Sequence, residues 1–248
     1  MFYLKLGGSL ITEKRSGEQR VRDQVVRDIS RDIRDFLHGN DIVLAHGAGS
    51  FGHIPVAKYG LDRGLSKGHE IEASEVFVSV SRLNCHISLI MQEEGVPVVP
   101  IPARSIFYRE RDGHVIAHLE TISELLRRGF IPLTHGDLIA DCLSGVYVLS
   151  ADEIPLYLLP LGLKEVIFLT DVPGVLGPDG RVLDVVSEDD VVKIESRAAK
   201  DVTGSMLGKL SRAFQLAHKG VKVIIAGYYN RGDLKRILDG EVGTKIVI

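Results

Sequence analysis

Short apolar runs alternate with segments of helical periodicity along almost the whole of this 248-residue chain. Strands are predicted at about 2–6, 41–45, 96–101, 130–134, 165–169, 221–226 and 245–248, and helices at about 20–38, 70–91, 121–128, 206–219 and 233–238, with another from about 151. Hairpin turns are predicted at 111–114 and 143–145, and a polar, glycine-rich loop at 54–69. This alternation favours an α/β fold with a mainly parallel sheet covered by helices on both faces. Since no repeat or linker interrupts it, we expect one sheet shared by both halves.

The composition argues against several classes of protein. A net charge of −3 does not suit a protein that coats nucleic acid, because binding the phosphate backbone requires a basic surface. Cys85 and Cys142 lack the spacing of a zinc site or a disulfide framework, which favours a reducing, cytoplasmic location. The longest strongly apolar stretch is short and contains Pro155 and Pro160, so no membrane partner is expected.

The segment HGAGSFGH at residues 46–53 follows a predicted strand directly. Three glycines in it have the G-x-G-x-x-G spacing of a dinucleotide-binding turn: Gly47, Gly49 and Gly52. Such a turn must open a helix, and an acidic residue about 20 positions later must end the next strand. Here Pro55 follows the turn closely, and Glu70 and Glu72 lie in a polar stretch that enters a helix. An NAD-dependent oxidoreductase is therefore only a distant alternative.

The first glycine turn of the chain, Gly7-Gly8-Ser9, follows the first predicted strand, and HGAGSFGH forms the second glycine turn. Two such cradles suit two phosphate-bearing ligands. Residues 204–209 do not form a Walker A loop, because one spacer is missing and Leu210 stands where Ser or Thr would ligate magnesium. Three lysines occupy awkward positions, in a buried strand, just beyond the first glycine turn and in the first turn of a helix: Lys5, Lys14 and Lys209. Together with a magnesium ion they would supply the positive charge that phosphoryl transfer needs.

Six motifs are found in order along the chain: KLGGSLITEK at 5–14, HGAGSFGH at 46–53, HGD at 135–137, SADE at 150–153, TDVPGV at 170–175 and DVTGSMLGK at 201–209. In these motifs the sequence resembles the amino acid kinase superfamily and, within it, the isopentenyl phosphate kinases. The resemblance implies a single domain over 1–248 with an open three-layer αβα sandwich, usually forming a homodimer. Its N-terminal lobe, about 1–150, would bind the acceptor, and its C-terminal lobe, about 151–248, would bind MgATP.

The resemblance also implies which residues act. The catalytic residues would be Lys5, Lys14, His53, Asp152 and Lys209, with Lys14 stabilising the transferring phosphoryl group and Asp152 orienting the lysines. The ATP-binding residues would be Lys5, Leu6, Gly7, Gly8, Ser9, Gly49, Thr170, Asp171, Val175, Ser205 and Lys209. The substrate-binding residues would be Ala48, Gly49, Gly52, His53, Gly136 and Ala151. The expected cofactors are ATP and Mg²⁺, and no side chain is assigned to the metal.

His53 narrows the chemical class of the phosphoryl acceptor. Many acceptors in this superfamily are carboxylates, whereas a histidine at this point resembles the branch whose acceptor already carries a phosphate or phosphonate. An imidazolium that faces a phosphate can donate a charge-assisted hydrogen bond. The expected reaction is direct in-line, ATP-dependent phosphorylation of isopentenyl phosphate to isopentenyl diphosphate, with Phe77 and Val80 as candidates for the wall around the apolar tail.

Two positions depart from the family pattern, because Ala151 and Ser205 stand where glycine is usual. These departures leave open a phosphonate, carboxylate or carbamate acceptor, and also a nucleotide-binding regulator without catalysis. Several polar residues also have structural readings of comparable weight. His46 and His135 are as compatible with a structural role as with a functional one, and aspartates such as Asp137 commonly cap helices or form turns.

Overall fold

Eight strands form one continuous sheet in the computed structural model, which describes residues 1–13, 19–36, 39–191 and 204–248. Their order across the sheet is β10-β12-β11-β9-β1-β2-β6-β3. Their bounds are β1 Phe2–Leu6, β2 Ile42–His46, β3 Val98–Pro100, β6 Ile131–His135, β9 Glu165–Thr170, β10 Val185–Val186, β11 Lys222–Gly227 and β12 Thr244–Ile246. Every neighbouring pair is parallel except β11 with β12. The predicted mainly parallel sheet, shared by both halves, is confirmed.

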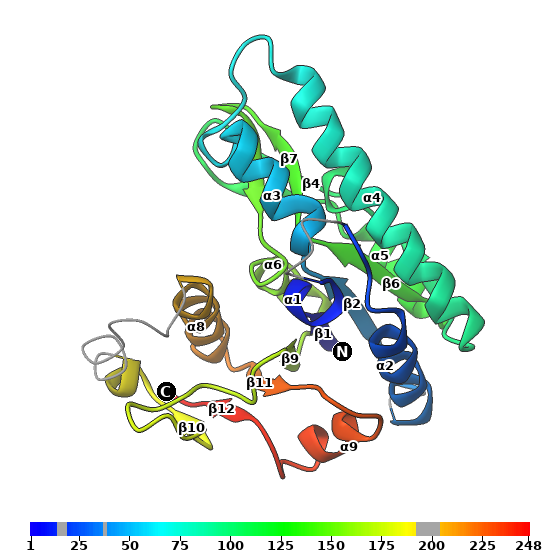
Figure 1. Ribbon diagram of the computed structural model, residues 1–248, viewed down its shortest axis with the longest axis vertical. Helices are drawn as coiled ribbons and strands as arrows, with labels where there is room; N and C mark the ends of the chain where they lie inside the picture. Colours follow the sequence, from blue (N-terminus) through cyan, green and yellow to red (C-terminus); the bar gives the residue numbers. More distant parts are fainter. Residues whose placement is uncertain (14–18, 37–38, 192–203) are drawn as a thin grey trace.

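Helices cover both faces of this sheet (Figure 1). On one face lie α2 (Asp23–Phe36), α4 (Glu70–Glu93) and α9 (Asp233–Leu238), and on the other lie α5 (Glu120–Arg127), α6 (Ile154–Tyr157) and α8 (Gly204–Ala217). Two further helices begin at the glycine turns, α1 (Gly8–Ile11) and α3 (Gly49–Tyr59). Among the described residues, no helix is both long enough and apolar enough to cross a membrane.

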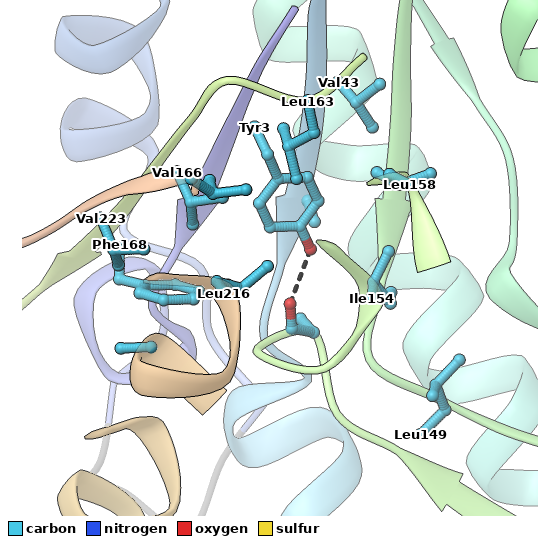
Figure 2. Close-up of a cluster of buried hydrophobic side chains, with 14 of the residues drawn as sticks. Tyr3, Val43, Leu149, Ile154, Leu158, Leu163, Val166, Phe168, Leu216 and Val223 are labelled. Carbon is cyan, nitrogen blue, oxygen red and sulfur yellow. Dashed lines mark hydrogen bonds between the residues drawn. The ribbon is translucent and has the colours of Figure 1, made fainter. Parts of the chain in front are cut away.

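The first strand lies at the centre of the sheet. β1 pairs in parallel with β2 on one side and with β9 on the other. Its side chains alternate between the two apolar cores, with Tyr3 on the α8 face and Leu4 on the α2 face. Figure 2 shows Tyr3 among apolar side chains, with its hydroxyl donating a hydrogen bond of 2.6 Å to the carbonyl of Ala151. Burial, followed by the charge of Asp152, raises the pKa of Tyr3 well above its usual value, so the hydroxyl remains a donor.

Replacing Tyr3 with Phe is expected to lower the free energy of unfolding by about 1–3 kcal/mol, because the buried carbonyl of Ala151 loses its donor. Urea denaturation of the two proteins measures the difference. Tyr59→Phe is the matched control, since the Tyr59 hydroxyl pairs with Glu75 at the exposed surface. Equal losses in the two variants would contradict the prediction.

A second, smaller sheet has the order β5-β4-β7-β8. Its strands are β4 Phe107–Arg109, β5 Val115–Ala117, β7 Asp137–Asp141 and β8 Gly145–Leu149, and they form the two hairpins predicted at 111–114 and 143–145. The chain passes from β6 of the large sheet to β7 of the small one through Gly136 alone. A third apolar cluster joins this sheet to α3 and α4 through residues such as Val80, Leu138 and Val146.

The prediction of a loop over residues 54–69 is wrong in its first part. The helix α3 continues from Gly49 to Tyr59 with Pro55 inside it, and a 3₁₀ turn follows at Leu61–Arg63. Proline has no N–H to offer to the carbonyl four residues earlier, which is that of Phe51. The hydroxyl of Ser79 on α4 donates to this carbonyl instead, at 2.8 Å. A tertiary hydrogen bond therefore takes the place of the missing helical one, so HGAGSFGH does open a helix.

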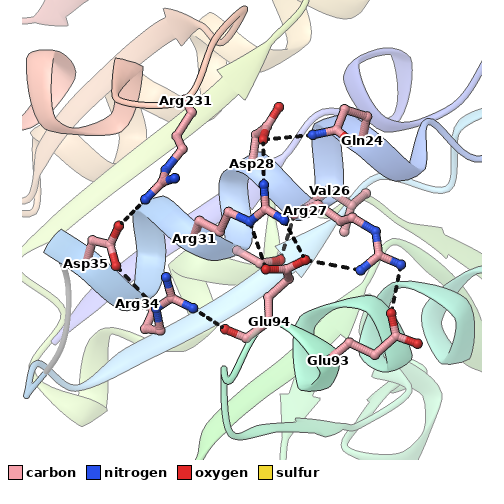
Figure 3. A network of polar contacts seen from close by, with 11 residues as sticks. Gln24, Val26, Arg27, Asp28, Arg31, Arg34, Asp35, Glu93, Glu94 and Arg231 are labelled. Carbon is pink, nitrogen blue, oxygen red and sulfur yellow. Dashed lines mark hydrogen bonds and ion pairs between the residues drawn. The ribbon is translucent and has the colours of Figure 1, made fainter.

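Ion pairs join α2 to the end of α4 (Figure 3). Arg27 pairs with Glu93 at 2.7 Å and with Glu94 at 3.1 Å, and Arg31 pairs with Glu94 at 2.8 Å. These pairs are partly exposed, so each contributes little stability by itself. As a network they fix the register of α4, the helix against which α3 packs.

Candidate active site

A buried cluster of charges lies between the two halves of the chain. Lys5 Nζ on β1 is 2.8 Å from Asp152 Oδ1, and Lys209 Nζ on α8 is 2.9 Å from both carboxylate oxygens of Asp152. Each lysine is only 7% exposed. Two ammonium groups and one carboxylate leave one net positive charge, so the cluster attracts a further anion. The structure therefore brings together three of the five residues predicted to be catalytic.

The pKa values of these groups reflect their mutual attraction. Burial by itself would raise the pKa of the Asp152 carboxyl, but the charges of Lys5 and Lys209 lower it to about 2. Burial and the neighbouring charge of Lys5 lower the pKa of Lys209 to about 8, although Asp152 opposes this shift. Asp152 is consequently ionised at neutral pH. The pKa of Lys209 lies close to neutral pH, so a second anionic partner would favour its protonated form.

The two glycine turns meet directly above this cluster. A Cβ on Gly8 would lie 2.5 Å from the amide nitrogen of Gly49, and a Cβ on Gly47 would lie 2.7 Å from that of Gly8. Gly49 has a φ of +51°, and a Cβ there would lie 2.3 Å from the hydroxyl oxygen of Thr12. Any larger residue would force these backbones apart. The pattern of two glycine turns thus reflects one surface, in which the ends of β1 and β2 approach backbone to backbone.

The first turn also contacts the end of β9. The amide of Gly7 donates to the carbonyl of Leu169 at 2.8 Å, and the hydroxyl of Ser9 donates to Asp171 at 2.6 Å. Thr170 ends β9 and is 7% exposed. Residues predicted to contact ATP in the two halves of the sequence therefore lie at one edge of the sheet, where its parallel strands end.

His53 lies in the first half of α3, and its side chain is exposed. Partial enclosure by the protein and the charge of Lys5 lower its pKa, while the charge of Asp152 opposes the shift. Since the charges of Lys5 and Asp152 both act on the imidazole, His53 lies within electrostatic reach of the buried cluster. Its ring is mostly neutral at neutral pH in the unliganded protein, and an approaching dianion would favour its protonation.

The turn that carries Asp152 is held by its neighbours. Ala151 is 3% exposed, and its carbonyl accepts the Tyr3 hydrogen bond. A Cβ on Gly136 would lie 3.2 Å from the amide nitrogen of Ala151 and 3.7 Å from its methyl carbon. The methyl group of Ala151 is accordingly accommodated within the core and packs beside Gly136.

The sequence pattern did not single out Arg104. Its guanidinium pairs with Asp137 at 2.8 Å, donates to the hydroxyl of Ser81 on α4 at 2.7 Å and lies 5.3 Å above the ring of Phe77. Burial raises the pKa of Asp137 to about 6, against the effect of Arg104. An arginine after a short strand has no distinctive signal in one sequence, so only the fold reveals this link between α4 and the HGD segment.

His46 and His135 form a stacked pair with ring centroids 5.3 Å apart, and both side chains are fully buried. Burial and the neighbouring His135 lower the pKa of His46 to about 3, and burial lowers the pKa of His135 to about 4. His46 contacts the carbonyl of Gly47 at 3.0 Å and the side chain of Asn84 at 3.2 Å. These contacts give both histidines a packing role beneath the glycine turn that begins at Gly47.

Other predicted site residues lie deeper or outside the described part of the chain. The side chains of Leu6 and Val175 are buried in the two cores. Gly52 allows α3 to approach α4, because a Cβ there would lie 2.4 Å from Ala48 Cβ and 3.3 Å from Val80. Lys14 and the side chain of Ser205 lie outside the described residues. Their predicted roles stay predictions.

Val80 and Phe77 take different places beside the HGAGSFGH segment. Val80 is 1% exposed within the third apolar cluster, against which Ala48, Val56 and Phe77 pack. Phe77 also lines a shallow hollow of about 340 Å³ on the outer side of α4. The apolar side chains next to the HGAGSFGH segment therefore come from α3, α4 and the small sheet.

Several proteins of similar sequence and fold are kinases. The sequence model described as the amino acid kinase family matches residues 2–227. An isopentenyl phosphate kinase from Methanothermobacter thermautotrophicus is 33% identical over 99% of this chain and 98% of its own length. An isopentenyl phosphate kinase from Haloferax volcanii is 30% identical over 90% of this chain and 94% of its own. A crystal structure of an isopentenyl phosphate kinase superposes with a TM-score of 0.85 at 28% identity, covering 99% of both chains.

Proposed function

The chain belongs to the amino acid kinase family, and from that premise we propose that it transfers the γ-phosphoryl group of ATP to isopentenyl phosphate. The observation that carries the proposal is the cluster of Lys5, Asp152 and Lys209 at the place where the two glycine turns meet, with His53 within electrostatic reach of Lys5 and Asp152. A net positive, buried site between two backbone cradles suits a reaction in which two anions must be brought together.

Each group in the site has a simple task in the proposed mechanism. Lys5 and Lys209 neutralise the negative charge that accumulates on the phosphoryl group in flight, and Asp152 holds both ammonium groups in place. Backbone N–H groups of the two glycine turns bind phosphate oxygens without the steric cost of side chains. An oxygen of the acceptor phosphate would attack the γ-phosphorus of ATP in line, and the bond from that phosphorus to the β–γ bridging oxygen would break as ADP leaves. The protein therefore supplies position and charge rather than a nucleophile.

ATP and Mg²⁺ fit these residues in different ways. The two buried lysines and the backbone N–H groups of the glycine turns suit the nucleotide phosphates. A Cβ on Gly8 or Gly47 would clash with the backbone of the other turn and push these N–H groups apart. The described residues contain no group of three metal-ligating side chains. Mg²⁺ would accordingly enter with the phosphates of ATP and spread their charge, which is its usual mode of binding to nucleotides.

The nature of the acceptor follows from its surroundings. His53 would bind the phosphate that the acceptor already carries, and the third apolar cluster lies next to the helix that bears it. A small molecule with one phosphate and a short apolar tail matches both features. The sequence relatives named above, both isopentenyl phosphate kinases, support the same assignment.

The experiment is a turnover assay with purified protein, ATP, Mg²⁺ and a panel of acceptors. The panel contains isopentenyl and dimethylallyl phosphate, a phosphonate, N-acetylglutamate and carbamate, and phosphorus NMR identifies the product. The proposal expects a diphosphate product from isopentenyl phosphate and little turnover of N-acetylglutamate and carbamate, which carry no phosphate. Tight ATP binding with no turnover of any acceptor would instead indicate a regulator.

His53→Ala is expected to lower kcat/KM for isopentenyl phosphate by about 10²-fold, because the acceptor phosphate loses a hydrogen-bond donor in the transition state. Steady-state kinetics measures the change, with ATP affinity measured separately. His86→Ala is the control, since His86 is exposed and pairs with the exposed Asp23 of α2. An effect of similar size on ATP affinity would point to a general disturbance and contradict the assignment.

A further inference from the structure

The residue after Asp152 is also a buried acid. Glu153 is 6% exposed, and three donors surround its carboxylate. Tyr157 donates at 2.5 Å, Tyr147 at 3.1 Å and Arg212 at 3.4 Å. Burying a carboxylate is costly unless it is paired and hydrogen-bonded. The three donors offset this cost and hold the Glu153 carboxylate in one position.

The partners of Glu153 come from three different elements. Tyr147 lies on β8 of the small sheet, Tyr157 on α6 and Arg212 on α8. The guanidinium of Arg109 on β4 lies 4.7 Å above the ring of Tyr147 and extends the cluster into the small sheet. Glu153 therefore joins α8 to β8 of the small sheet.

Two parallel ion pairs connect α8 to this turn. Lys209 and Arg212 are three residues apart, so they lie on the same side of the helix. They reach consecutive carboxylates, Lys209 to Asp152 and Arg212 to Glu153. The first pair belongs to the buried cluster, whereas the second lies about one helical turn further along α8.

We propose that Glu153 and Arg212 are positioning residues, which hold α8 so that the Lys209 ammonium stays directed at the phosphates. The role rests on the proposed function, because it assigns Lys209 to ATP. The two residues act through Lys209 and need not touch the nucleotide themselves. A kinase that must align two anions is sensitive to small displacements of such a cation.

The test is a double-mutant cycle on ATP affinity, measured by calorimetry in the absence of any acceptor. Arg212→Met is expected to weaken ATP binding about tenfold, and Lys209→Met is expected to weaken it more. If Arg212 acts through Lys209, the double variant should bind ATP no more weakly than Lys209→Met alone. Additive losses in the double variant would overturn the proposal.

Turnover supplies a second readout. Arg212→Met is expected to lower kcat about tenfold while the KM for the acceptor stays within about twofold, and Arg212→Lys should recover part of the loss. The matched control is Arg128→Met, which breaks an exposed pair with Glu124 on α5 and should leave both constants unchanged. Unchanged kcat in Arg212→Met, or no recovery with Lys, would overturn the proposal.

The two hypotheses fail in distinguishable ways. If the protein binds ATP but does not phosphorylate isopentenyl phosphate, the proposed function fails while the cycle on ATP affinity still tests the pair. Arg212 is 36% exposed at its side chain, so its replacement should not prevent folding. A thermal melt of each variant checks this. If Arg212→Met shows no cooperative unfolding transition, Arg212→Gln is used in its place.

Discussion

Asp152→Asn is expected to lower kcat about 10³-fold and the free energy of unfolding by about 3–5 kcal/mol. The variant leaves two ammonium groups facing each other, both 7% exposed and without the carboxylate that lies 2.8 and 2.9 Å from them. Lys209, whose pKa is already lowered to about 8 by burial and Lys5, would lose its proton more readily. The site would then have less positive charge for the phosphoryl group.

The stability of Asp152→Asn should recover partly as the pH rises from about 6 to 9. A lysine with a lowered pKa in the folded protein binds fewer protons than it does in the unfolded chain, and stability then rises with pH. Urea denaturation across this range measures the slope, and the initial rate of ATP turnover measures kcat. Asp179→Asn, at an exposed carboxylate, is the control. A variant with normal turnover would show that Asp152 does not organise the lysines.

Gly8→Ala is expected to lower kcat about 10²-fold and to destabilise the protein by about 1–3 kcal/mol. The added methyl carbon would lie 2.5 Å from the amide nitrogen of Gly49, and backbone cannot give way as a flexible side chain can. The two glycine turns would separate, and the N–H groups that are proposed to bind phosphate would move with them.

Two further glycine variants make the Gly8 result interpretable. Gly49→Ala should be at least as harmful, because its φ of +51° disfavours a side chain in addition to the close contact. Gly208→Ala is the stability control, since a Cβ there meets no atom within 4 Å and alanine favours a helix. Circular dichroism on heating ranks the three. Equal stability of Gly8→Ala and Gly208→Ala would contradict the close approach.

Much of the fold could be predicted from local pattern, because apolar periodicity and glycine after a strand report directly on burial and turns. The strands at 2–6 and 165–169 and the helix at 233–238 appear close to their expected bounds. The helix through Pro55 could not be foreseen, because the donor that replaces its missing hydrogen bond comes from Ser79. The two-residue strand β10 carries too little periodicity to be recognised.

The candidate site divides in the same way. Lys5 and Lys209 were conspicuous because a cation in a buried strand or at a helix start is unfavourable without an anion. Arg104 and Arg212 carried no such signal, and Glu153 stood in the SADE motif without an assigned role, since charged residues at those places are ordinary in a sequence. Their partners lie on other elements, so only the tertiary structure shows that they are paired.

The central position of β1 has consequences for how the chain folds during synthesis. Residues 2–6 leave the ribosome before the other strands of the sheet and can pair with residues 42–46 early, but their other edge pairs with residues 165–169. That edge must wait until two thirds of the chain has left the ribosome, with apolar side chains and unpaired backbone still exposed. The high sequence separation of this contact predicts slow folding and a period of vulnerability to aggregation for the nascent chain.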